Sequence, residues 1–192
     1  DGAWTYTMSG AHDEFVAGST YTDSFTASTA DGTTRRVTVT ITGSNDAAQI
    51  GGSDTADLTE TDAAQSTGGT LTVSDVDSAA TFVVQSAVAG SNGYGTFSLD
   101  AGGVWTYTMG TAHDEFIAGQ TYTDSFTAAS ADGTTQLITV TITGTNDPAA
   151  IGGTTSASLT ETDVAQTTGG TLTINDVDSA ASFVARPSVV GG

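Results

Sequence analysis

The sequence predicts an all-β chain of tandem Greek-key β-sandwich domains, and three observations carry that prediction. First, residues 1–91 match residues 102–192 without a gap, with 62 of 91 positions identical, and the period of 101 residues suits a sandwich domain rather than a small solenoid unit. Second, apolar and polar side chains alternate with a two-residue period, as in half-buried strands. Third, turn signals separate the strand patterns, and no segment shows a sustained helical period.

The clearest strands alternate large apolar residues with threonine. Residues 4–8 read Trp-Thr-Tyr-Thr-Met and return at 105–109, so Trp4 and Trp105 are expected to pack in a core rather than to stack on sugars. Residues 37–42 alternate Val, Val and Ile with threonine, whose β-branched side chain suits the outer face of a sheet.

Shorter strands and turns fill the rest of the repeat. Apolar alternation predicts strands over residues 70–73 and 95–99, each of which follows glycines. The dipeptides Asp31-Gly32 and Asp132-Gly133 predict hairpin turns between two strands. Asp23 and its copy Asp124 each lie in the middle of a strand pattern and are expected to face solvent.

Domain boundaries are expected after Asn45-Asp46 and Asn146-Asp147, which follow the last strand of the repeat. Residues 47–147 would then form a complete domain, 1–46 the C-terminal half of one repeat, and 148–192 the N-terminal half of the next. The chain is a window on a longer array, or the halves of neighbouring chains complete each other by strand exchange. The first arrangement is preferred because the two halves together lack a counterpart of residues 92–101.

The charge of the chain limits its partners. It carries 22 acidic residues, three arginines and no lysine, with a formal net charge of −19. Such a surface repels nucleic acid and anionic membranes, and no run approaches the length of an apolar membrane span, so direct membrane insertion is not expected. It attracts cations, and an excess of hard oxygen ligands favours calcium. Disulfides and thiolate metal sites are excluded because there is no cysteine.

Most of the acidic residues recur in four clusters per repeat, which makes them candidate metal ligands. The members are Asp13 and Glu14, with Asp114 and Glu115, in the loop after the Trp strand; Asn45 and Asp46, with Asn146 and Asp147, in the linker; Glu60 and Glu161 after the first strand; and Asp75 and Asp77, with Asp176 and Asp178, at the end of the strand at 70–73 and of its copy.

These positions predict calcium sites at the junctions between domains. Loops of a sandwich gather at its two ends, and an Asp-x-Asp at a strand end places two carboxylates on one side of the chain. Calcium takes six to eight oxygen ligands, so carboxylates that would repel each other at a junction become a coordination shell when the ion is present.

The motifs that carry a family resemblance span the whole chain. They include Gly-x-Trp-Thr-Tyr-Thr, Tyr-Thr-Asp-Ser-Phe-Thr, the Asp-Gly-Thr-Thr turn, Asp-Val-Asp-Ser, and Thr-Ile-Thr-Gly-Thr-Asn-Asp-Pro at 141–148. The repeat thereby resembles the VCBS repeats of giant bacterial RTX-type adhesins and, more distantly, the cadherin domain. That resemblance implies an immunoglobulin-like sandwich that binds calcium between domains.

The resemblance also implies a ligand set for each junction. The first would use Asp13 or Glu14, then Asn45, Asp46, Asp75, Asp77 and Asp132. The second would use Glu60 or its loop, then Asp114 or Glu115, and Asn146, Asp147, Asp176 and Asp178. The linker departs from the cadherin pattern Asp-x-Asn-Asp, since a glycine stands where its first Asp would be. Fewer ions per junction would follow. Interpretations without a metal ion stay open, in which Asp132 is a turn residue and the acidic loops are solvated surface.

No motif indicates catalysis. His12 and His113 are lone imidazoles beside acids, and no serine lies in a nucleophile elbow, so an enzyme is not expected. The sequence instead favours calcium-rigidified extender repeats of a large secreted surface adhesin, whose partners are neighbouring repeats and which acts in cell adhesion and biofilm scaffolding. The alternatives are a subunit of an extracellular fibre assembled by strand exchange, or a module that binds a surface glycan.

Overall fold

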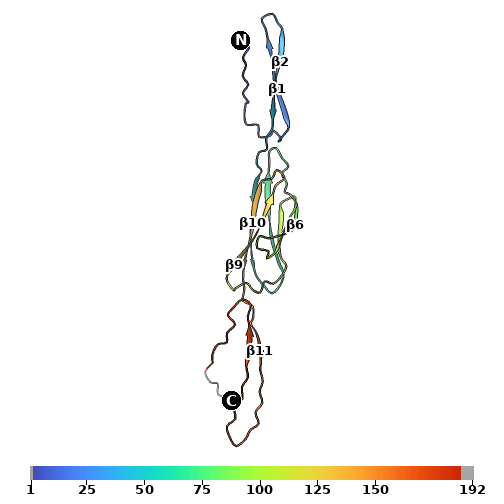
Figure 1. Cartoon of the computed structure of the whole chain (residues 1–192). Coiled ribbons are helices and arrows are strands. Elements are labelled where there is room, and N and C mark those ends of the chain that lie inside the picture. The colour runs from blue at the N-terminus through green and yellow to red at the C-terminus, as the bar shows by residue number, and fades with distance from the viewer. Residues whose placement is uncertain (1, 187–192) are drawn as a thin grey trace.

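The computed structural model describes residues 2–186 and is all-β, with twelve strands and no helix in that range. No helix of the described residues has the length and apolar character needed to cross a bilayer. The described residues form a rod, with the first and last repeats of the chain towards its opposite ends (Figure 1). A two-stranded hairpin lies at the N-terminal end, a sandwich in the middle and a two-stranded sheet towards the C-terminal end.

The strands run, in chain order, as β1 (Thr20–Ser28), β2 (Thr34–Thr42), β3 (Gln49–Gly52), β4 (Thr55–Thr59), β5 (Gln65–Ser74), β6 (Gln85–Ala89), β7 (Thr96–Leu99), β8 (Val104–Met109), β9 (Thr121–Ala129), β10 (Thr135–Thr143), β11 (Ala150–Gly153) and β12 (Leu172–Asn175). The expected all-β sandwich is therefore confirmed, with β1 and β2 joined through the predicted Asp31-Gly32 turn, where Gly32 has a φ of 86°.

The central sandwich has one sheet of five strands and one of three. The larger sheet has the order β3-β5-β8-β7-β6 and the smaller one the order β4-β10-β9. All of these pairs are antiparallel except β4 with β10, where Thr55–Thr59 runs parallel to Thr139–Thr143. The parallel pair brings the ends of β4 and β10 to the same end of the domain.

The core lies between the two sheets and follows the alternation in the sequence. In β8, Trp105, Tyr107 and Met109 are buried while the intervening threonines are exposed. In β10, every second residue from Ile138 to Ile142 is buried in the same way. The indole Nε1 of Trp105 donates a hydrogen bond to the backbone oxygen of Ser53 at 2.7 Å, so this large ring is buried with its polar atom satisfied.

The predicted strand at residues 4–8 is wrong for the half-repeat at the start of the chain, residues 2–46, which is called the N-terminal half-repeat below. Trp4 is 52% exposed, whereas Trp105, its copy, is 1% exposed, and residues 2–8 pair with no strand. In the central domain β8 is held between β5 and β7. The chain has no counterpart of β7 beside Trp4, and the counterpart of β5 lies at the far end of the rod. A strand pattern with no neighbour therefore leaves its backbone unpaired and its aromatic face in water.

Asp124 corrects a second expectation, because it is fully buried rather than solvent-facing. Its carboxylate accepts hydrogen bonds from the backbone N–H of Asn92 at 2.9 Å, the N–H of Gly95 at 3.1 Å and the hydroxyl of Tyr107 at 3.1 Å. Burial and the charge of Asp124 raise the pKa of Tyr107 far above its ordinary value, which keeps this hydroxyl a donor. The carboxylate thus fixes the loop before β7 against the core.

The equivalent Asp23 stays exposed because this loop has no copy in the N-terminal half-repeat. Gly90 makes room for Asp124 in the central domain, since a Cβ atom at Gly90 would lie 2.1 Å from the carboxylate. The two aspartates therefore share a sequence motif and differ only in what the rest of the chain places around them.

We expect Asp124→Asn to lower the free energy of unfolding by about 2 kcal/mol, because the amide turns a donor towards buried N–H groups that need an acceptor. Asp23→Asn is the matched control and should change it by less than about 0.5 kcal/mol. Urea unfolding followed by the fluorescence of Trp105 measures both. Equal effects of the two substitutions would contradict the role given to Asp124.

Candidate metal centre

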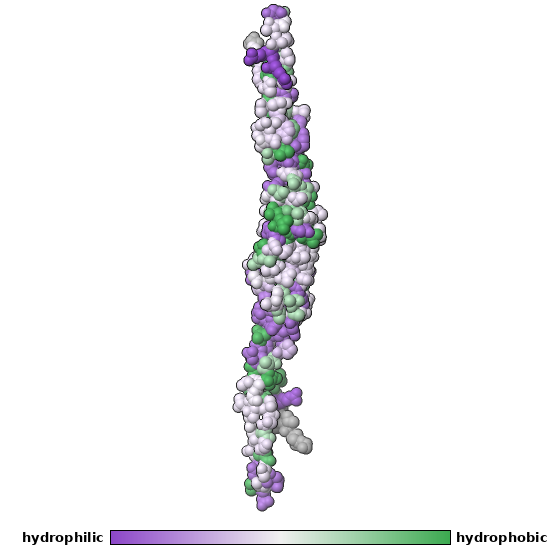
Figure 2. Space-filling model, turned by 90° about the vertical axis from the view of Figure 1, so that its right-hand side faces the viewer, coloured by the Kyte–Doolittle hydropathy of each residue, from purple (hydrophilic) through white to green (hydrophobic). Residues whose placement is uncertain are grey.

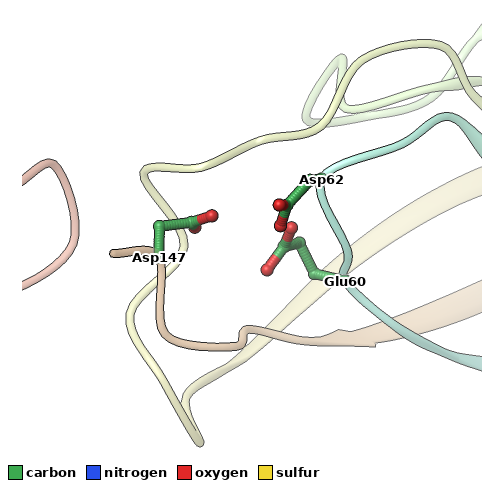
Figure 3. Close-up of side chains that lie close together, drawn as sticks. All are labelled: Glu60, Asp62 and Asp147. Atoms are coloured by element: carbon green, nitrogen blue, oxygen red, sulfur yellow. The ribbon is translucent and has the colours of Figure 1, made fainter. Parts of the chain in front are cut away.

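Three carboxylates meet at the second junction, between the central domain and the half-repeat at the end of the chain, residues 148–186, which is called the C-terminal half-repeat. Glu60 directly follows β4, Asp62 lies two residues further on, and Asp147 lies in the linker after β10. One ligand oxygen from each lies within 4.8 Å of the others. Figure 3 shows the three side chains converging from these two segments. The parallel pairing of β4 with β10 places them together, since it brings both strand ends to the same edge.

The backbone around Glu60 orients its side chain. The N–H of Glu60 donates to the oxygen of Thr143 at 2.8 Å and continues the β4–β10 pairing by one residue. Its Oε2 accepts from the N–H of Thr145 at 3.1 Å and from the Thr145 hydroxyl at 2.7 Å. The other oxygen, Oε1, is buried and has no hydrogen-bond partner. One half of this carboxylate is therefore used to hold the linker, and the other half is free to bind a ligand.

Asp147 and Asp178 continue the cluster into the C-terminal half-repeat. The N–H of Asp147 donates to Oδ2 of Asp178 at 3.4 Å, which ties the linker to the segment after β12. Both residues are buried, and Asp147 Oδ2 and Asp178 Oδ1 have no partner. Burial, followed by the negative charges of Glu60, Asp114, Asp62 and Asp178, raises the pKa of Asp147. Within residues 2–186, no cationic side chain pairs with these carboxylates.

The first junction, between the N-terminal half-repeat and the central domain, gathers buried carboxylates around Asp75 and Asp77. Asp75 Oδ1 accepts from the backbone N–H groups of Asp77 at 3.0 Å and Ser78 at 2.8 Å, forming a turn after β5. Asp75 Oδ2 and both carboxylate oxygens of Asp77 are buried without partners. Burial and the neighbouring carboxyl of Asp75 raise the pKa of Asp77, with a further contribution from the charge of Asp46.

Asp132 lies at the first junction and is also the turn residue of the β9–β10 hairpin. Its Oδ1 accepts from the N–H of Thr134 at 3.0 Å within the turn. Its Oδ2 accepts from the N–H of Ala48 at 3.0 Å and from the amide of Asn45 at 3.3 Å, both in the linker. These donors, with the Ser130 hydroxyl the strongest, hold the pKa of Asp132 well below its ordinary range. Asp132 is thus both a residue of the hairpin turn and a residue of the junction.

The acidic loops after the Trp strands divide into two kinds of residue. Asp13 lines a recess with Asp46 and Asp75, and Asp114 lines one with Asp62 and Asp147. The neighbouring glutamates bond to histidines of their own loops, and Glu115 also lines a recess with Asp114 and Val177. Glu14 bonds to His12 Nδ1 at 2.9 Å and Glu115 to His113 Nδ1 at 2.8 Å.

The two histidines that bond to these glutamates adopt the left-handed backbone conformation, with a φ of 58° for His12 and 57° for His113. Each ring also stacks on the phenylalanine that follows it in the loop, Phe15 or Phe116. The alternatives Asp13 or Glu14, and Asp114 or Glu115, stay predictions. Each aspartate lines a recess at a junction, and each glutamate bonds to a histidine.

Of the remaining predicted ligands, Asn146 and Asp176 lie at the second junction and Glu161 does not. Asn146 is exposed and its amide donates to the backbone oxygen of Asp147 at 3.0 Å. Asp176 Oδ1 accepts from the N–H of Ser179 at 2.9 Å, which repeats the turn made by Asp75. Glu161 is exposed, and no acidic cluster forms around it in the described chain. Asp62 was not predicted, although its spacing of two residues from Glu60 places both side chains on one side of an extended chain.

The buried side-chain polar atoms that lack a partner show whether the site fits a metal ion. Within residues 2–186 all of them are carboxylate oxygens at the two junctions: Glu60 Oε1, Asp75 Oδ2, both oxygens of Asp77, Asp147 Oδ2 and Asp178 Oδ1. A buried acceptor without a donor is costly, and a cation satisfies several such acceptors at once. The donor set is all oxygen, which fits a hard divalent ion.

A comparison with known protein families agrees with the fold. A family profile described as a bacterial cadherin-like domain matches residues 45–144, which is just over half of the chain. No curated protein matches the sequence. The matched range includes Asn45, Asp46, Glu60, Asp62, Asp75 and Asp77.

Without metal, we expect the free energy of unfolding to fall as the pH rises from about 4 to about 7. Because the pKa values of Asp77 and Asp147 are raised, the folded chain holds protons that the unfolded chain has lost in this range. Thermal unfolding in a chelator at several pH values measures this slope. The Asp77→Asn/Asp147→Asn double variant should reduce it, and a wild-type stability that rises with pH over the same range would contradict the account.

Proposed function

Because the chain belongs to the bacterial cadherin-like domain family, we propose that it is a calcium-rigidified extender segment of a large extracellular bacterial surface adhesin. One observation carries the proposal. Among the described residues, buried carboxylate oxygens without a donor gather at the two junctions and nowhere else. A divalent ion at each junction would use these oxygens and would hold neighbouring domains in line.

Calcium suits the second junction better than other common divalent ions. Zinc prefers histidine and cysteine ligands, and the cluster offers neither. Magnesium demands near-ideal octahedral geometry and keeps several waters, whereas calcium accepts an irregular shell of carboxylate and carbonyl oxygens. Glu60, Asp62, Asp147 and Asp178 would hold the ion, with Asp114 at the rim.

The first junction offers a similar set from this chain. Asp46, Asp75 and Asp77 would hold the ion, with Asp13 at the rim and Asp132 holding the linker in place. When bound, calcium supplies the positive charge that these carboxylates lack. Carboxylates that belong to two domains then become one shell, so the hinge between the domains stiffens.

The rod shape supports an extender role (Figure 1). The chain presents three bodies in line, and each junction lies on the axis between two of them. Stiff junctions would keep such an array extended and carry a binding domain away from the cell surface. The partners of the segment would then be neighbouring repeats, and its location would be outside the cell.

We expect Glu60→Gln/Asp147→Asn to weaken calcium binding at the second junction at least tenfold, because it removes two of the charges that compensate the ion. Isothermal titration calorimetry measures the affinity and the number of ions. Glu115→Gln is the control, since Glu115 lies in the loop between β8 and β9 and bonds to His113, and it should weaken binding far less than the double variant.

The same ion should stabilise the wild type, because it binds only the folded state. At a calcium concentration one hundred times the dissociation constant, the gain is about 2.7 kcal/mol per site. The double variant should lose this gain at one site. A wild-type melting temperature that is equal in calcium and in a chelator would contradict the proposal.

A further inference from the structure

We propose that Tyr94 is a positioning residue for the calcium site at the second junction, because it holds His113 and thereby fixes the loop that presents Asp114 to the site. All three residues belong to the central domain. The calcium part of this inference rests on the proposed function, whereas the positioning of the loop does not.

Tyr94 lies in a loop that is anchored to the core. This support loop, residues 90–95, joins β6 to β7. Asp124 accepts hydrogen bonds from the N–H groups of Asn92 and Gly95 on the inner side of the loop. Gly95 lies directly on the ring of Tyr107, since a Cβ atom at Gly95 would be 2.5 Å from that ring. The core therefore fixes the support loop from below.

Tyr94 contacts the acidic loop, residues 110–120 between β8 and β9, in two ways. Its backbone oxygen accepts a hydrogen bond from His113 Nε2 at 2.9 Å. Its ring meets the rings of Phe116 and Tyr122 edge-on, with centroids 4.8 Å and 6.1 Å away. Edge-to-face contacts of this kind add to the stabilisation that burial supplies. The support loop thus holds one side of the acidic loop.

His113 is the residue through which this contact acts. Its ring stacks on Phe116 with centroids 4.9 Å apart, and its Nδ1 bonds to Glu115 at 2.8 Å. Its backbone has a φ of 57°, a conformation that is unfavourable for a residue with a Cβ atom. The contacts of the ring, including the bond to Tyr94, maintain this conformation and so set the direction in which the chain leaves His113.

Asp114 follows His113 directly and lines a recess at the second junction with Asp62 and Asp147. Its side chain is exposed, so its position is set by the backbone of the acidic loop. A ligand that is already in place costs less to order when the ion binds. An aromatic support beside acidic residues also fits the surface in Figure 2, where hydrophilic and apolar patches adjoin along the rod.

The contacts from Asp124 to Asp114 form one continuous series through the support loop, Tyr94 and His113. Coupling between a contact and a binding site is reciprocal. If Tyr94 raises the calcium affinity by fixing the acidic loop, calcium in turn stabilises the contact between the two loops.

Calcium titrations of the full chain test the inference. The Asp46→Asn/Asp77→Asn background removes two carboxylates of the first junction, so calorimetry then reports on the second. In this background Tyr94→Ala should weaken calcium binding by about fivefold or more, because the acidic loop loses the ring that holds it. Tyr94→Phe keeps the ring and the backbone oxygen and should bind as tightly as the background.

A double variant shows whether Tyr94 acts through His113. His113→Asn removes the imidazole but tolerates the left-handed conformation, and it should weaken binding about as much as Tyr94→Ala. Because both substitutions free the same loop, Tyr94→Ala/His113→Asn should bind no more weakly than the single variants.

Hydrogen exchange of the Phe116 amide in a chelator reports on the acidic loop without calcium. This N–H donates to the backbone oxygen of His113 at 2.9 Å. Tyr94→Ala should speed its exchange by about fivefold or more through local opening. Leu99→Ala is the control for a loss of stability alone, because Leu99 is a buried core residue at the end of β7. It should lower the melting temperature and leave both the exchange rate and the calcium affinity unchanged.

Each outcome decides the inference. Unchanged exchange of Phe116 in Tyr94→Ala, or a calcium affinity equal to that of the background, overturns the positioning role. Additive losses in the double variant, or an equal loss of affinity in Leu99→Ala, also overturn it. A background chain that binds no calcium overturns the proposed function and the calcium part together, and the exchange measurement then decides separately whether Tyr94 positions the loop.

Discussion

The structure depends on one constraint. Carboxylates gather at the two junctions, and no cationic side chain of the described residues neutralises them. Two carboxylates about 4 Å apart near a protein surface repel each other by about 4 kcal/mol at an effective dielectric constant of about 20. The chain holds three such groups within 4.8 Å at Glu60, Asp62 and Asp147 and has three arginines in all. The sandwich is held together by the apolar faces of its strands. The chain continues into the next domain through a junction whose carboxylates repel one another unless a cation lies between them.

The sheet topology produces this concentration of charge. The parallel pairing of β4 with β10 sends the chain after β4 and the linker after β10 out at the same end of the domain. The Asp-Val-Asp segment of the following domain then folds back on the same linker, through the bond from Asp147 to Asp178. Ligands from three distant parts of the sequence thereby meet at one place, so the state of the junction controls how one domain lies on the next.

The two-residue alternation predicted the long strands β8 and β10 of the central domain, whereas the short strands β3 and β6 were not predicted. It was not enough where structure depends on a neighbour, and Trp4 is exposed because strand pairing is a property of two segments. Asp124 shows a different error, since the alternation places it on the face of Tyr122 and Phe126, but its charge suggested solvent. The backbone donors that make a buried carboxylate stable come from residues 92–95, whose approach no local pattern reveals.

The central claim, that the carboxylates of Glu60, Asp62 and Asp147 share one divalent ion, is tested most directly by anomalous diffraction from crystals of the chain grown with calcium. The account predicts an anomalous peak between these side chains, with oxygens about 2.3–2.6 Å from it. A map with no peak there, in which the three carboxylates point apart into solvent, would contradict it.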